Sequence, residues 1–205
     1  LLGFAVASAS AADSIGNASF ETNNVGAAGY AYVGTGVTAV DWLFTGGTGV
    51  SANNSAWGGA SASGGYFAFI QDRTLNGLEN DGSISSISQT FSLSSAADLS
   101  FSFDLAQRAF NNGGTQSIVV SLDGAILQTI TPLSTWAGFT TAASAVSLGQ
   151  HTLSFTGNNT NTGDSSVFLD NVSMTVTAVP EPSSIAMLLA GIGMVGAITR
   201  RRTRA

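Results

Sequence analysis

Residues 99–105, Leu-Ser-Phe-Ser-Phe-Asp-Leu, alternate strictly between apolar and polar side chains. A period of two places one set of side chains against a core and the other in water, which is the pattern of a half-buried β-strand. No stretch before residue 183 shows convincing 3.6-residue periodicity, so helices are not expected there. The pattern therefore predicts an all-β domain.

Further strands are predicted at 65–71, 86–93, 117–122, 125–131, 151–156 and 167–176. Asp123-Gly124 between two of them predicts a two-residue hairpin turn, because glycine readily adopts positive φ. Gly, Ser, Thr, Ala and Asn are abundant, which favours short strands joined by turns. Many short strands with regular turns indicate a β-sandwich or jelly roll.

Charge and cysteine content limit the partners of this domain, which we place at residues 13–177. Outside the cluster at 200–204, the only basic residues are Arg73 and Arg108, while the chain has twelve acidic residues. Nucleic acids and anionic membrane surfaces require clustered positive charge, so we expect neither as a partner. The absence of cysteine excludes disulfides, thiolate metal sites and thiol nucleophiles.

The first residues have the character of a targeting segment. Residues 1–7 are apolar, Ala9-Ser10-Ala11 fits an A-x-A cleavage site, and Asp13 begins a polar stretch. We expect residues 1–12 to be part of a secretory signal peptide, and the alternative is a buried first strand.

Residues 178–205 form a second targeting segment in three parts. Pro180, Glu181 and Pro182 precede an uncharged apolar helix expected at 184–199, and Arg200, Arg201 and Arg202 follow it. With its flanks the helix would span roughly 25 Å, the short limit for crossing a bilayer. We expect it to hold the protein in the membrane transiently, with the arginines on the cytoplasmic side.

The order of these three parts resembles the PEP-CTERM sorting signal of Gram-negative bacteria. That resemblance implies processing by an exosortase, a membrane-embedded transpeptidase that cuts near the Pro-Glu-Pro. It also implies export to the cell surface or extracellular matrix and an association with exopolysaccharide.

Asp170 is an anomaly in the last predicted strand. By period two it shares a side with Phe168, Val172, Met174 and Val176, which are all apolar. A buried, unpaired carboxylate is expensive, so it requires a cation or several hydrogen-bond donors. The alternative is a bulge that turns Asp170 toward solvent.

The opening segment Asn-Ala-Ser-Phe-Glu at 17–21 and the closing segment Phe-Leu-Asp-Asn-Val-Ser at 168–173 resemble the terminal strands of galactose-binding-like jelly rolls, a fold shared by many carbohydrate-binding modules. The resemblance implies a structural Ca²⁺ held by Glu21 and Asp170 together with backbone carbonyls. Ala18 departs from the family pattern, which usually has glycine there.

The sequence offers little for catalysis. His151 is the only histidine, and at a turn-to-strand junction it is expected to pack or cap. The acids at 72, 79 and 81 cluster in a predicted loop, where acids are usually just solvated, although a paired-carboxylate glycosidase site is a formal option. We therefore predict no catalytic residues and no enzymatic activity.

Sugar recognition combines an aromatic platform with a few polar groups. The candidates are Trp57, Gln71, Arg73, Asp104 and Arg108, whereas Trp42 and Trp136 are expected to serve packing. The favoured interpretation is an exported module that binds extracellular polysaccharide. The alternatives are a structural matrix protein without a specific glycan and, as a distant third, a glycoside hydrolase.

Overall fold

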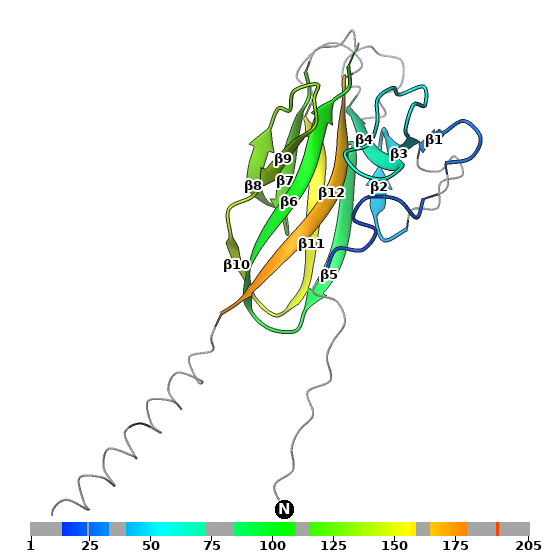
Figure 1. Cartoon of the computed structure of the whole chain (residues 1–205). Coiled ribbons are helices and arrows are strands. Elements are labelled where there is room, and N and C mark those ends of the chain that lie inside the picture. Colours follow the sequence, from blue (N-terminus) through cyan, green and yellow to red (C-terminus); the bar gives the residue numbers. More distant parts are fainter. Residues whose placement is uncertain are drawn as a thin grey trace, which may run out of the picture.

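Two antiparallel β-sheets lie face to face in the described part of the chain (Figure 1). The computed structural model describes residues 14–23, 25–32, 40–72, 84–109, 115–158, 165–179 and 192. Up to residue 179 these residues form twelve strands and no helix. The expected all-β sandwich is therefore confirmed.

The first sheet has seven strands in the order β1-β3-β4-β12-β6-β10, and β9 also pairs with β6. Its strands are β1 (Tyr30–Tyr32), β3 (Thr48–Ala52), β4 (Tyr66–Asp72), β6 (Ala97–Gln107), β9 (Ala137–Thr140), β10 (Ser144–Val146) and β12 (Ser165–Ala178). The last strand of the domain, β12, thus lies in the interior of the sheet between β4 and β6.

The second sheet has five strands in the order β2-β5-β11-β7-β8. Its strands are β2 (Leu43–Thr45), β5 (Ser86–Leu93), β7 (Ser117–Leu122), β8 (Ala125–Ile130) and β11 (Gly149–Asn158). The turn between β7 and β8 is the predicted one, since Asp123 and Gly124 have φ angles of 52° and 81°. Positive φ at both positions matches the right-handed twist of the two strands.

The main core fills the space between the sheets and is built from alternate residues of each strand. On β6, Phe101 and Phe103 are buried, while the polar residues between them stay partly exposed. On β11, Leu153 and Phe155 are fully buried in the same core. Trp42 also belongs to it and packs against Phe155, so its predicted packing role is confirmed.

A β-bulge in β12 overturns the predicted face of that strand. The pairing register with β6 shifts between Asp170 and Ser173, and Asn171 has a φ of 52°. One extra residue reverses the alternation, so Leu169 and Val172 both face the main core while Phe168 lies on the opposite side. The prediction that Phe168, Asp170 and Val172 share one face was therefore wrong. Asp170 is nevertheless fully buried, so the bulge does not turn it toward solvent.

The sequence did not predict five short strands of three to five residues, and all of them except β3 lie at sheet edges: β1, β2, β3, β9 and β10. The opening segment differs too, since residues 16–22 form turns rather than a strand. It still joins the last strand, because the Val172 N–H donates to the Ala18 carbonyl at 2.9 Å.

Both expected targeting segments fall largely outside the described residues. The structure does not describe residues 1–12, and of the expected helix at 184–199 it describes only Ile192. Within the described part of the chain, no helix is long and apolar enough to cross a membrane.

Truncation of a core leucine tests this architecture. Leu153 is 0% exposed, whereas Leu148, five residues earlier in the sequence, is 69% exposed. Leu153→Ala should lower the free energy of unfolding by about 2–5 kcal/mol, because it leaves a cavity between the sheets. Leu148→Ala should change it by less than about 0.5 kcal/mol. Urea denaturation of both variants measures the difference, and equal losses would contradict the assigned core.

Candidate functional site

A second group of buried aromatic residues lies on the outer face of the first sheet, away from the main core. It includes Phe67 and Phe69 of β4 and Phe168 of β12. These side chains alternate with residues of the main core, so the pleat directs them to the opposite face of the sheet. Residues 53–65, which connect β3 to β4 and are called the covering loop below, bring Trp57 onto this cluster.

Both faces of the Trp57 ring are occupied. The ring stacks on Phe69 with centroids 3.9 Å apart and an interplanar angle of 18°. The Arg108 Cζ lies 4.3 Å from the centroid of the same ring. Since Phe69 fills one face, the guanidinium must cover the other, as a cation–π pair. Trp57 is consequently only 6% exposed.

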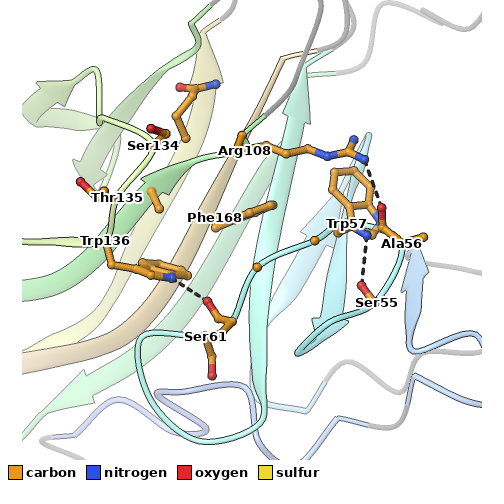
Figure 2. Close-up of a pocket in the computed structure, with 15 residues that line it drawn as sticks. Ser55, Ala56, Trp57, Ser61, Arg108, Ser134, Thr135, Trp136 and Phe168 are labelled. Atoms are coloured by element: carbon orange, nitrogen blue, oxygen red, sulfur yellow. Dashed lines mark hydrogen bonds between the residues drawn. The ribbon is translucent and has the colours of Figure 1, made fainter.

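A cavity of about 630 Å³ opens beside this pair (Figure 2). Its walls are the covering loop, the segment after β6 and the segment before β9, and Phe168 lies between them. The lining residues are Ser55, Ala56, Trp57, Gly58, Gly59, Ala60, Ser61, Ala106, Gln107, Arg108, Ala109, Ser134, Thr135, Trp136 and Phe168.

Trp136 forms the wall opposite Trp57 and Arg108 (Figure 2). Its ring is half-buried and packs against Phe168, with centroids 6.2 Å apart. The indole N–H donates to the Ala60 carbonyl at 2.7 Å, which joins this wall to the covering loop. Sequence reasoning assigned Trp136 to packing alone. Its place in the polar run Ser-Thr-Trp between two strands was the available signal that it borders a surface site.

The structure brings two of the five predicted sugar ligands into the cavity, Trp57 and Arg108. Gln71 is buried, and its Oε1 accepts a 2.7 Å hydrogen bond from the Tyr32 hydroxyl. Asp104 accepts a 2.7 Å bond from the Asn171 side-chain amide. Neither residue is among those that line the cavity. Arg73 lies outside the described residues.

Two carboxylates anchor the covering loop to the sandwich. Glu21 Oε1 accepts the backbone N–H groups of Gly65 and Tyr66, both at 2.9 Å. Asp170 Oδ2 accepts the backbone N–H of Ser63 at 2.9 Å. The end of the loop that follows Trp57 is thus held by charged acceptors, which form stronger bonds than neutral ones.

These two predicted metal ligands also lie close enough to influence each other. Burial, and in addition the negative charge of Glu21, raise the pKa of Asp170 to about 6, although backbone N–H groups oppose the rise. Burial is the largest cause of this rise, and the charge of Glu21 is the smallest. No group of three or more His, Cys, Asp or Glu side chains in the described part of the chain could hold a metal. A cation here would therefore need carbonyl or water oxygens as well, which Ca²⁺ accepts.

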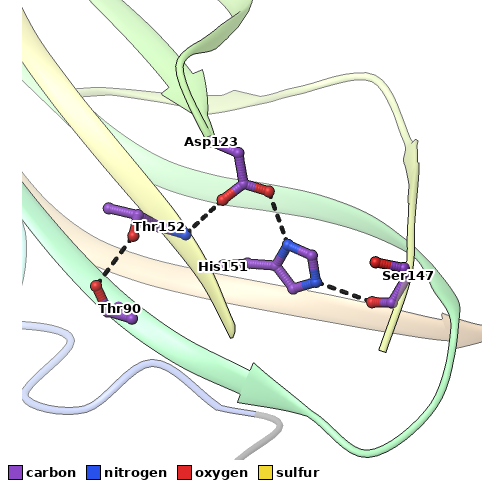
Figure 3. A network of polar contacts seen from close by, with 5 residues as sticks. All are labelled: Thr90, Asp123, Ser147, His151 and Thr152. Atoms are coloured by element: carbon purple, nitrogen blue, oxygen red, sulfur yellow. Dashed lines mark hydrogen bonds and ion pairs between the residues drawn. The ribbon is translucent and has the colours of Figure 1, made fainter. Parts of the chain in front are cut away.

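His151 is occupied by structural hydrogen bonds (Figure 3). Nδ1 lies 2.7 Å from Asp123 Oδ2, and Nε2 lies 2.8 Å from the Ser147 carbonyl. Both partners are acceptors, so the ring satisfies both only as the doubly protonated imidazolium. The Asp123 bond, partly opposed by burial, raises the pKa of His151. Among the described residues, no serine hydroxyl bonds to the His151 ring, so the geometry is not that of a Ser-His-Asp triad.

The fold defines a class, the two-sheet jelly-roll β-sandwich. The tandem CBM22-1-CBM22-2 domain of Paenibacillus barcinonensis Xyn10C is similar, with a TM-score of 0.51, 16% sequence identity, and coverage of 86% of this chain and 49% of that one. The Stig cyclase Fisc from Fischerella sp. TAU has a TM-score of 0.54 and 20% identity, over 82% and 100% of the chains. TmCBM61, solved with beta-1,4-galactotriose, has a TM-score of 0.49 and 15% identity, over 78% and 96%. At these identities the likeness shows the fold alone.

The sorting segment is matched in its own right. Residues 178–202 match the family described as the PEP-CTERM protein-sorting motif. The chain therefore carries a PEP-CTERM motif after a jelly-roll domain, and the motif implies export to a surface or extracellular destination. A search of the curated proteins found no match to this sequence.

The His151–Asp123 pair predicts a pH dependence of stability. A raised His pKa adds stability that is fully present below about 6.5 and is lost as pH rises through the folded-state pKa. Burial acts to raise the pKa of Asp123, but its bonds to His151 and Thr152 lower it overall, so its contribution is lost only in acid. We expect the melting temperature of the wild type to fall more than that of His151→Gln between pH 6 and pH 9.

The effect should correspond to about 1 kcal/mol or less, because the pair is partly exposed. Thermal melts of the two proteins across this pH range measure it. Parallel pH dependence of the two melting temperatures would show that folding does not raise the pKa of His151.

Proposed function

We propose that this protein is an exported, surface-directed module that binds polysaccharide without catalysing a reaction. The observation that carries the proposal is the cavity of about 630 Å³ that lies between two tryptophans and an arginine on the outer face of the first sheet. A volume in this range suits a small ligand or a few sugar units of a longer chain. The fold, which is shared with carbohydrate-binding modules, adds support.

The chemistry of the lining suits a sugar. Pyranose rings present apolar C–H faces and polar hydroxyl rims, and an aromatic ring with nearby hydroxyl and amide groups complements both. The half-buried Trp136 ring supplies the aromatic surface, and Phe168 supplies an apolar floor. Ser134, Thr135 and Ser61 contribute hydrogen-bonding groups around them.

Trp57 has a different role from the platform expected of it. Because Phe69 and Arg108 cover its two faces, no face remains for a sugar to stack on. Trp57 instead fixes the covering loop and seats the guanidinium of Arg108. In this proposal Trp136 makes the stacking contact and Trp57 shapes the wall opposite to it.

The same lining supports a non-catalytic role. Glycoside hydrolysis requires a pair of carboxyl groups flanking the bond that is cut. The described residues that line the cavity include no Asp, Glu or His. The related proposal for the C-terminal segment is that an exosortase recognises the PEP-CTERM motif and that an apolar helix holds the protein in the membrane before processing.

We also propose that Glu21 and Asp170 bind a structural Ca²⁺. The proposal rests on the burial of Asp170, on its proximity to a second carboxylate, and on the absence of a basic side chain bonded to either group in the described residues. Such an ion would neutralise both carboxylates, which in turn anchor the covering loop.

Glycan binding is tested on the purified protein with an array of bacterial and plant polysaccharides. Trp136→Ala should weaken binding to any positive glycan by about tenfold or more, because it removes the exposed aromatic surface. Trp136→Phe keeps a ring and should retain most of the affinity. Leu148→Ala, exposed and outside the cavity lining, serves as the unaffected control.

The outcomes separate the candidate functions. Saturable binding that Trp136→Ala abolishes supports the module, and binding that persists unchanged would place the sugar elsewhere. No binding to any glycan would reject the proposal in favour of a structural matrix protein. Turnover of a chromogenic glycan would show a hydrolase.

Calcium binding is tested by thermal melting after chelation. At 100-fold excess over its Kd, added Ca²⁺ should raise the melting temperature by about 5–10 °C. Asp170→Asn should abolish that increase, because the amide carries no negative charge. Asp98→Asn is the matched control, since Asp98 is a partly exposed residue near the start of β6. An unchanged melt of the wild type on adding Ca²⁺ rules out the site.

A further inference from the structure

The described lining of the cavity includes one charged side chain, and it is positive. Arg108 is the only charged residue among the described residues that line it. Asp104 lies on the same face of β6 as Ala106, but it is outside the lining and accepts a hydrogen bond from Asn171. A negatively charged ligand in this cavity would therefore meet a cation without an adjoining carboxylate that repels it.

The placement of this cation is unusual for so acidic a domain. Residues 13–177 contain two arginines and eleven acidic residues. Despite that excess, no carboxylate of the described residues forms an ion pair with Arg108. An arginine that served only to neutralise the fold would be expected beside one of these acids.

The guanidinium is also held in place. Its Cζ lies 4.3 Å from the centroid of the Trp57 ring, and Nη2 donates to the Ala56 carbonyl at a long 3.4 Å. The backbone of Arg108 is fixed as well, since its N–H donates to the Ser166 carbonyl at 2.9 Å. The guanidinium has five N–H donors, and the described residues accept only this one long bond from it.

We propose that the cavity selects acidic sugars, with Arg108 binding the carboxylate of a uronic acid residue. This inference rests on the proposed polysaccharide-binding function and names the class of glycan. The planar carboxylate matches the guanidinium fork and can accept two parallel hydrogen bonds, which makes the pair strong and directional. The apolar neighbours Trp57 and Phe168 reduce the screening of that pair by water.

The test compares acidic oligosaccharides with their own neutral esters. Trisaccharides of galacturonate, glucuronate and guluronate, each paired with its methyl ester, are titrated into the purified protein by calorimetry. The wild type should bind the preferred acid about tenfold more tightly than its ester. Arg108→Gln should reduce that ratio to about one while binding of the ester persists. Arg108→Lys keeps the charge but not the fork, and it should retain a ratio above that of Arg108→Gln.

Two controls exclude trivial explanations. Thr129→Glu lowers the net charge by one, as Arg108→Gln does, but at an exposed position of β8 in the second sheet. It should leave the ratio of acid to ester affinity unchanged. Raising NaCl from 50 to 500 mM should reduce the wild-type ratio, a result that does not depend on any variant folding.

Equal affinity for acid and ester, a preference that survives in Arg108→Gln, or a wild-type ratio that is the same at 50 and 500 mM NaCl overturns the inference. If only neutral glycans bind, the acidic-sugar inference fails while the proposed function stands. If no glycan of either kind binds, both fail together. Binding of a sulfated but not a carboxylated sugar also rejects the uronic acid assignment.

Discussion

Two carboxylates, the exposed Glu21 and the buried Asp170, position the loop on which the cavity depends. Residues 53–65 are rich in Gly, Ala and Ser and contain a single large apolar side chain, Trp57. Such a segment gains little from burial, so its place on the sheet depends on Trp57 and on the N–H groups that donate to Glu21 and Asp170. The cavity wall is therefore set partly by residues that do not line the cavity, and a cation at those carboxylates would reinforce it.

The bulge in β12 gives one strand two functions. Before Asn171 the strand directs Phe168 outward to the floor of the cavity, and after it Val172 returns to the main core. The same irregularity lets the Asn171 side chain donate to Asp104 and accept from Ser63 of the covering loop. Without the extra residue, Val172 would share the outer face with Phe168 instead of the core face with Leu169.

The long strands could be predicted from the sequence, but the arrangement of the residues around the cavity could not. The strict alternation at 99–105 and the Asp-Gly turn correctly indicated β6 and the β7–β8 hairpin, because both signals are local. Edge strands such as β1 and β9 are three and four residues long, too short for a period to show. Their pairing partners are distant in sequence.

The site was foreseen only in part for the same reason. Arg108 stood out because arginine is rare in this domain, and Trp57 because it lies in a Gly/Ala/Ser-rich stretch predicted to be a loop. Their contact, however, depends on how the covering loop folds over β4. The role of Trp136 depends on a hydrogen bond to Ala60, far away in sequence. The bulge at Asn171 is a backbone feature that the alternation of side chains could not reveal.

The position of β12 has a mechanical consequence. The sorting motif at 178–202 begins at the end of this strand, and the strand is hydrogen-bonded on one side to β4 and on the other to β6 (Figure 1). Tension applied through the C-terminal segment would therefore pull along a central strand and load many backbone hydrogen bonds in shear at once. The sorting motif therefore begins on a strand that is paired with β6 between Val167 and Ala178.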